Sequence, residues 1–180
     1  MGQTADKLAR CFSAFVQMPI PKVHLLESAD VSMALTALDG DSVVTAVTQA
    51  FFGDGISGEA LMRFIDAAAG DLSALLGYPP ARSDEEQCER VLEMASLLAA
   101  TCIHHVLAQL NVDVLIAHPV LLGRHRNLSQ MFGEQQFPWD RTLALELNYG
   151  FEGYAVRCDL VLLFHQHALP ALFSKLEMLL

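Results

Sequence analysis

The sequence carries one pattern twice, and this internal repeat limits the folds that the chain can adopt. When Pro21 is aligned on Pro119, Phe12 falls on Leu110 and the apolar stretches of the two halves coincide. Each half reads as a helix, a strand with a proline at its start, a hairpin and a closing helix. Because neither half can bury a sheet face alone, we expect the two to pair about a pseudo-twofold axis.

The individual elements follow from apolar periodicity and from the turn residues between them. In order they are a helix at 4–16, a strand at 22–27, strands at 42–52 and 56–65, a helix at 67–76, a long helix from 83 to about 110, a strand at 112–122 interrupted by Pro119, strands at 141–151 and 154–164, and a helix at 168–179. We therefore predict an α+β fold, in which two long helices cover one mainly antiparallel sheet. It forms one domain over residues 1–180, with repeats at about 1–80 and 81–180.

Charge and hydrophobicity exclude several classes of function. The formal net charge is −10 and no cluster of Lys and Arg occurs, which argues against nucleic acid and anionic membranes as partners. No apolar run reaches the roughly 18 residues of a membrane helix, and no secretory signal is present, so we predict a cytoplasmic protein. Hydrophobic residues make up 53% of the chain, enough to leave apolar surface for a homodimer.

The long helix predicts the candidate site. At 100° per residue, Glu89, Glu93 and Ser96 lie within about 60° of one another. The other side of this helix is apolar and belongs to the core: Met94, Ala95, Leu98, Ala99, Cys102, Val106 and Leu110. The acids nearer the start of the helix are explained by capping, since Ser83 and Glu86 form a capping box. We call Glu89, Glu93 and Ser96 the acidic stripe.

The acidic stripe resembles the signature of the chemotaxis phosphatases CheC, CheX and FliY. That signature reads Asp/Ser-x-x-x-Glu-x-x-Asn, then 22 residues, then Pro. Glu93 and Pro119 match it with the same gap, whereas Glu89 replaces Asp/Ser and Ser96 replaces Asn. The tandem repeat with its paired Pro21, the hairpin SVVTAVTQAFFGDGISGEAL and the terminal helix also resemble this family. The resemblance covers nearly the whole chain and implies a CheC-like fold.

The resemblance implies hydrolysis of the aspartyl phosphate on a CheY-type receiver domain. It assigns Glu93 and Ser96 as the catalytic pair. Glu93 would grip a receiver lysine, and the receiver would supply Mg²⁺, so no cofactor of the chain's own is expected. Glu89, Glu93 and His104 would contact the receiver. A serine hydroxyl is about one bond shorter than the family's amide, and a misplacement of about 1 Å costs on the order of 100-fold in rate. The alternative is a non-catalytic protein of the same fold that docks a receiver or a CheD-like partner.

Two further patterns favour ordinary structural roles. Residues 53–58 match GxGxxG, but a β-like run follows where a dinucleotide site needs a helix. His104 and His105 point about 100° apart on a helix, and His165 and His167 have no third ligand by spacing, so we predict no metal site.

Overall fold

The computed structural model describes residues 2–27, 30, 43–65, 69–128, 131 and 141–178. Its helices and strands follow the predicted order, but the strand predicted at 112–122 is two strands, at 115–116 and 120–126, and a strand at 16–17 and a 3₁₀ helix at 166–168 were not predicted. The helices and strands are α1 (Gly2–Phe12), β1 (Val16–Gln17), β2 (Lys22–Glu27), β3 (Val44–Gly53), β4 (Ile56–Ile65), α3 (Ala69–Leu75), α4 (Asp84–Ala108), β5 (Leu115–Ile116), β6 (Val120–Arg126), β7 (Arg141–Phe151), β8 (Arg157–Phe164), the short 3₁₀ helix η2 (Gln166–Ala168) and α6 (Leu169–Glu177).

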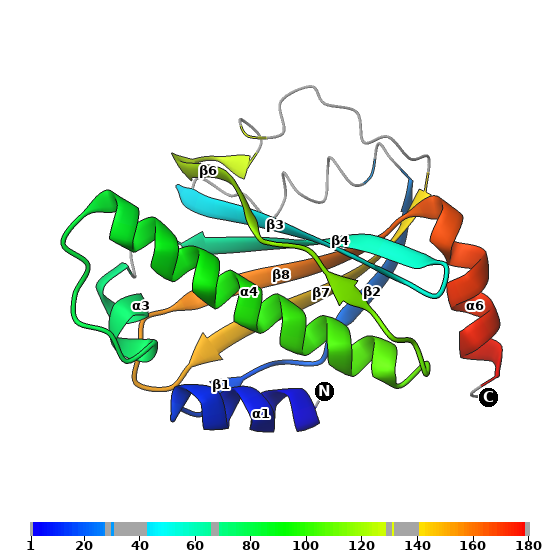
Figure 1. The fold of residues 1–180 in the computed structure, drawn as a ribbon, viewed down its shortest axis with the longest axis horizontal. Helices are drawn as coiled ribbons and strands as arrows, with labels where there is room; N and C mark the ends of the chain where they lie inside the picture. Colours follow the sequence, from blue (N-terminus) through cyan, green and yellow to red (C-terminus); the bar gives the residue numbers. More distant parts are fainter. Residues whose placement is uncertain are drawn as a thin grey trace.

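The eight described strands form one sheet in the order β1-β7-β8-β4-β3-β5, with β2 also paired to β7 and β6 also paired to β3. Every pairing between described strands is antiparallel. Figure 1 shows α4 lying across this sheet and α1 beside its lower edge. The predicted α+β class is therefore confirmed, and the described ladders are antiparallel throughout.

The predicted repeat is visible in the registers of the edge strands. Lys22 in β2 pairs with Glu146 in β7, and Val120 in β6 pairs with Thr48 in β3. Val120 lies 98 positions after Lys22, and Glu146 lies 98 positions after Thr48. This is the offset between Pro21 and Pro119. The two strands that follow Pro21 and Pro119 thus occupy equivalent places, and β4 and β8 meet at the centre of the sheet. The division into repeats near residue 80 stays a prediction.

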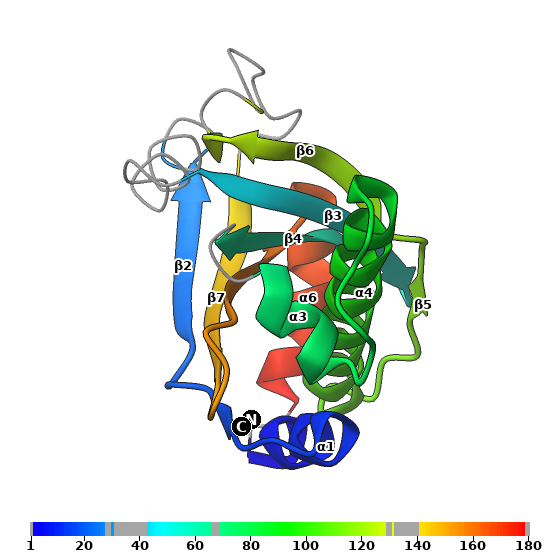
Figure 2. The ribbon, with the colours of Figure 1, turned by 90° about the vertical axis from the view of Figure 1, so that its left-hand side faces the viewer.

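The helices share one core with one face of the sheet. Buried side chains from α1, α3, α4 and α6 belong to the same cluster. Figure 2 shows α3 and α4 on the same side of the sheet, and Figure 1 shows α6 at the opposite end of the fold from α3. Only α4 is long, with 25 residues, whereas α1 has 11. The prediction of two long covering helices was wrong in this respect. The predicted helix at 4–16 ends at Phe12 because Ser13 has a φ of 50°, which is not helical.

The GxGxxG segment forms a hairpin, as its β-like continuation predicts. Asp54 and Gly55 have φ values of 50° and 77° and make the two-residue turn between β3 and β4. A Cβ at Gly53 would overlap the backbone oxygen of Asp113, and a Cβ at Gly58 would overlap that of Leu163. These glycines therefore permit a turn and two close backbone contacts, and they need no nucleotide to explain them.

Among the described residues, one helix, α4, has the length and the apolar composition that crossing a membrane would require. Its apolar side packs on the sheet instead. Eight of its residues are buried: Val91, Met94, Ala95, Leu98, Ala99, Cys102, Ile103 and Leu107. Its other side carries Glu89, Glu93 and His104 in exposed positions. This two-sided pattern is that of a core helix in a soluble fold.

Candidate functional site

The candidate site begins with the way α4 starts. Ser83 is the N-cap, and its Oγ accepts a hydrogen bond of 3.2 Å from the backbone N–H of Glu86. The Glu86 carboxylate accepts from the backbone N–H of Arg82 at 2.8 Å, one residue before the position that a capping box uses. The local sequence thus fixes the start of α4. Packing of the apolar side of α4 on the sheet leaves Glu89 and Glu93 exposed.

Glu89 and Glu93 are exposed, and Ser96 is half-buried. The Tyr78 hydroxyl donates to Oε1 of Glu93 at 3.2 Å, and the guanidinium of Arg90 lies 3.9 Å from the centre of the Tyr78 ring. Tyr78 follows α3, so a second element holds the Glu93 carboxylate in place. In the described part of the chain, Tyr78 is the one hydrogen-bond partner of Glu93, which leaves Oε2 facing solvent. An oriented carboxylate of this kind can accept an ammonium group from a partner.

Ser96 lies deeper than a fully exposed stripe residue because β3 reaches it from below. The Gln49 side-chain Nε2 donates to Ser96 Oγ at 3.3 Å and to the backbone oxygen of Ala117 at 2.8 Å. Gln49 is buried, with 3% of its surface exposed. Gln49 was not among the predicted site residues. The repeat contained a signal for it, because the equivalent residue 98 positions on is the buried, apolar Leu147, so a polar side chain at position 49 is unexpected.

Pro119 lies between β5 and β6, two residues after Ala117, and Pro21 directly precedes β2. The Ala117 backbone N–H donates to the oxygen of Ala50 at 2.9 Å. Gln49 and Ala50, which are adjacent in β3, therefore bind the carbonyl oxygen and the N–H of Ala117. The structure thus brings Ser96 and the segment that leads to Pro119 to a common contact, Gln49, although 22 residues separate Ser96 from Pro119 in the sequence.

His104 is exposed on the same side of α4 as Glu93, 11 residues further along, which is about 16 Å. It lines an open hollow of about 620 Å³ at the C-terminal end of α4, together with His105, Asp113 and, from α1, Lys7. His104 therefore lies on the same helix face as the acidic stripe but at its far end. A partner would have to cover three turns of α4 to contact both Glu93 and His104.

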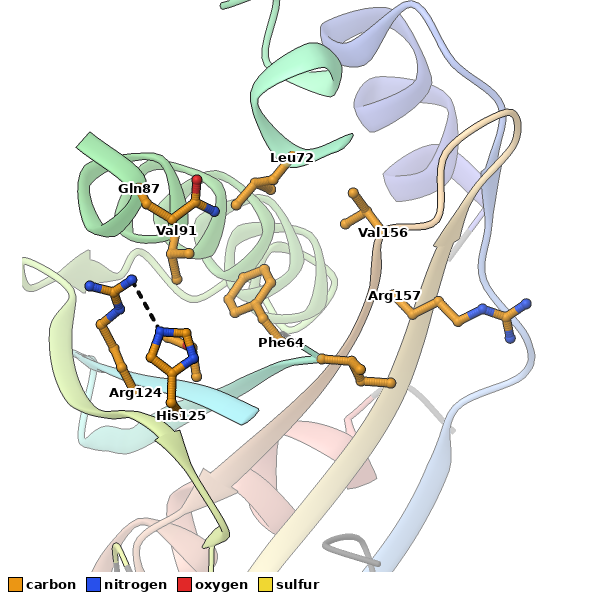
Figure 3. Close-up of a pocket in the computed structure, with 10 residues that line it drawn as sticks. Phe64, Leu72, Gln87, Val91, Arg124, His125, Val156 and Arg157 are labelled. Atoms are coloured by element: carbon orange, nitrogen blue, oxygen red, sulfur yellow. Dashed lines mark hydrogen bonds between the residues drawn. The ribbon is translucent and has the colours of Figure 1, made fainter. Parts of the chain in front are cut away.

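Figure 3 shows a second hollow, between the first half of α4, α3 and β6. Phe64, Leu72 and Val91 form its apolar wall, and Arg124 and His125, 3.4 Å apart, stand at one side. Its volume is about 40 Å³, which holds one or two waters and no metabolite. We assign it no binding role.

No group of three or more His, Cys, Asp or Glu residues that could hold a metal occurs within the described ranges. His165 and His167 do meet, since both contact the Ser57 hydroxyl, at 3.3 and 2.8 Å. Burial lowers the pKa of His165, and the neighbouring His167 also lowers it, whereas Glu59 opposes the shift. This cluster lies beside η2, at the turn end of β4, and is separate from the acidic stripe.

Comparison with known proteins gives the fold. The sequence matches no protein-family model and has no significant match among curated proteins. Solved structures do match. FliY of Thermotoga maritima superposes with a TM-score of 0.65 at 14% identity, over 97% of this chain and 88% of that one. CheX of Vibrio vulnificus gives 0.56 at 14%, over 91% and 95%. The FliM middle domain of Vibrio alginolyticus gives 0.62 at 9%, over 97% and 93%.

These matches extend across nearly the whole chain, so the resemblance seen in the sequence is confirmed at the level of fold. A structure of FliM in complex with SpeE, from Helicobacter pylori, matches as well, with a TM-score of 0.59 over 97% of this chain. At these identities the matches establish architecture and leave the chemistry of the acidic stripe to be argued from its own residues. The chain has the CheC-like fold that FliY, CheX and the FliM middle domain share.

Proposed function

We propose that this protein docks a CheY-type receiver domain through the exposed face of α4 and promotes slow hydrolysis of its aspartyl phosphate. One observation carries the proposal. In a CheC-like fold, α4 carries Glu89, Glu93 and Ser96 along one side at the spacing of the phosphatase signature, with both glutamates exposed and Ser96 half-buried. The protein would act in chemotaxis or related two-component signalling, in the cytoplasm.

Each residue of the stripe has a physical role in this proposal. The Glu93 carboxylate, held by Tyr78, would pair with a lysine of the receiver and set the orientation of the complex. Glu89 would extend the acidic surface by one turn, and His104 would contact the receiver at its edge. Ser96 would face the acyl phosphate. Phosphoryl transfer to water depends mainly on positioning and electrostatics, and the receiver would supply Mg²⁺ for the phosphoryl charge. The chain would need no cofactor of its own.

A second candidate is a protein of the same fold that binds without hydrolysis. One observation favours it: Ser96 Oγ already accepts a hydrogen bond from Gln49, so one of its two lone pairs is not available to a water molecule. Such a protein would hold a phosphorylated receiver or a CheD-like partner. In both candidate functions Glu93 is the residue that recognises the partner. The homodimer expected from the apolar surface stays a prediction.

Binding of a receiver tests the proposal directly. The Glu93→Gln variant keeps the shape of the side chain and its hydrogen bond with Tyr78 but removes the charge. We expect it to bind a receiver loaded with beryllium fluoride and Mg²⁺ about tenfold more weakly in titration calorimetry, because one interfacial charge pair loses a member. Glu152→Gln, in the exposed turn after β7, removes the same charge outside α4 and serves as the control. Equal affinities for Glu93→Gln and wild type would exclude the stripe as the receiver site.

A further inference from the structure

Gln49 stands in a place where the fold calls for an apolar side chain. It lies on the helix-facing side of β3, between Val47 and Phe51, both of which are in the main core. The register of β3 against β6 matches that of β7 against β2, so the position equivalent to Gln49 in β7 is that of Leu147. Leu147 is 1% exposed and also belongs to the main core. An apolar residue therefore suits this position in the other half of the same sheet.

The Gln49 amide is only partly satisfied there. Its Oε1 is buried and has no hydrogen-bond partner among the described residues. A buried polar atom without a partner lowers stability, so a leucine or methionine would serve the core better. The amide is thus poorly explained by packing and is better explained by what its nitrogen contacts.

Those contacts occupy one of the two acceptor positions of the Ser96 hydroxyl. The Ala117 carbonyl can only accept, so the Gln49 atom 2.8 Å from it must be the nitrogen. The second hydrogen of this nitrogen points to Ser96 Oγ at 3.3 Å, and an amide nitrogen cannot accept. Ser96 therefore accepts from Gln49, and its own proton is directed elsewhere. Among the described residues, Ser96 makes no hydrogen bond besides this one, and its side chain is half-buried.

We propose that Gln49 is a positioning residue, which turns the Ser96 hydroxyl into an outward-facing hydrogen-bond donor for a phosphoryl oxygen of the receiver's acyl phosphate. This inference rests on the proposed function and states what Ser96 does within it. Serines within helices commonly donate to a carbonyl of their own helix. Ser96 makes no such bond among the described residues and points to Gln49 instead, which leaves its proton for a ligand. The same amide ties α4 to Ala117, and hence to the segment that carries Pro119.

The test replaces Gln49 by methionine, which has a similar length and no hydrogen-bond donors. Wild type, Gln49→Met, Ser96→Ala and the double variant are titrated with a CheY receiver, either free or loaded with beryllium fluoride and Mg²⁺. We expect Gln49→Met to lose about tenfold in affinity for the loaded receiver and nothing for the free one. In the Ser96→Ala background, Gln49→Met should have no further effect, because the two residues act as one unit. The urea midpoint should stay equal to that of wild type or rise.

The outcomes separate this inference from the function it rests on. If wild type prefers the loaded receiver and Gln49→Met does so equally, Gln49 is not a positioning residue, and the proposed function stands. If wild type binds neither form, both are overturned. If Gln49→Met and the second variant Gln49→Leu both lower the urea midpoint strongly, the role of Gln49 is structural and the inference is wrong.

Discussion

Restoring the amide at residue 96 is the perturbation that separates slow catalysis from binding alone. In Ser96→Asn the side chain gains one bond in length and a planar group that can both donate and accept. The helix should tolerate the change, since Ser and Asn have similar helix propensities. The new Oδ1 can accept the hydrogen bond that Gln49 now gives to Ser96 Oγ at 3.3 Å. We therefore expect Ser96→Asn to fold and to hydrolyse the receiver phosphate faster than wild type.

The size of the effect follows from the geometry of the site. The serine hydroxyl ends about one bond short of the place that an amide would reach, and about 1 Å of misplacement is worth on the order of 100-fold in rate. Because Ser96 is half-buried beside Gln49, the larger side chain must displace some neighbours. We expect this to lower the free energy of unfolding by about 1 kcal/mol, at the low end of the cost of overpacking.

The assay follows the loss of labelled phosphate from a receiver in the presence of Mg²⁺, for wild type, Ser96→Asn and Ser96→Ala. A rate for Ser96→Asn up to about 100-fold above wild type would support a docked receiver with a poorly placed water. A wild-type rate above background that falls in Ser96→Ala would show that the serine itself contributes. If Ser96→Asn binds the receiver and all three rates equal spontaneous hydrolysis, the reasoning about position 96 is refuted.

Three predictions concern the rest of the molecule. Arg63 and Asp159 form a largely buried ion pair at the centre of the sheet, with 14% and 17% of their side chains exposed. Arg63→Met should lower the free energy of unfolding in urea by about 3 kcal/mol, because it leaves Asp159 unpaired, and the double variant with Asp159→Leu should lower it by less. Equal losses for the two variants would show that the single variant creates no unpaired charge. Gly53→Ala should cost more than about 2 kcal/mol in the same assay, because its Cβ would overlap a facing backbone carbonyl; a loss below 0.5 kcal/mol, about that of an ordinary surface change, would contradict this. Burial raises the pKa of Cys102 to about 11, so at pH 8 its thiol is almost entirely protonated; iodoacetamide should modify the exposed Cys11 in the folded protein and Cys102 only after unfolding, as peptide mass spectrometry would show.

Much of the fold could be predicted because it depends on patterns that a single sequence displays. The offset between Pro21 and Pro119 predicted which strands occupy equivalent edges, and the observed pairing has that offset. The ends of the helices and strands were harder to predict from the sequence. The first helix ends at Phe12 because Ser13 has a positive φ. A glycine at this position would have predicted that conformation, whereas a serine does not. The difference in length between α1 and α4 likewise does not follow from apolar periodicity alone.

The candidate site was predictable along one helix and not across elements. Helical periodicity places Glu89, Glu93 and Ser96 on one side, and the structure has them there. The contact of Ser96 with Gln49 joins residues 47 positions apart, and that of Glu93 with Tyr78 depends on how α3 meets α4. Such contacts arise from tertiary packing, which periodicity within one element does not contain.

The two sides of α4 also explain how a fold can persist while its chemistry changes. The buried side, with residues such as Leu98 and Cys102, packs on the sheet, where loss of a large side chain costs about 2–5 kcal/mol. The exposed stripe contributes little to the core, and exchanges there usually stay within about 0.5 kcal/mol. Selection for folding therefore constrains the first side and leaves the second to function. A chain can then share the fold of FliY and CheX at 14% identity, while Ser96 replaces the amide of the signature that its acidic stripe resembles. In the proposed function, Gln49, which is buried yet partly unsatisfied, would hold Ser96 for the receiver, so function rather than folding would account for an amide at this position.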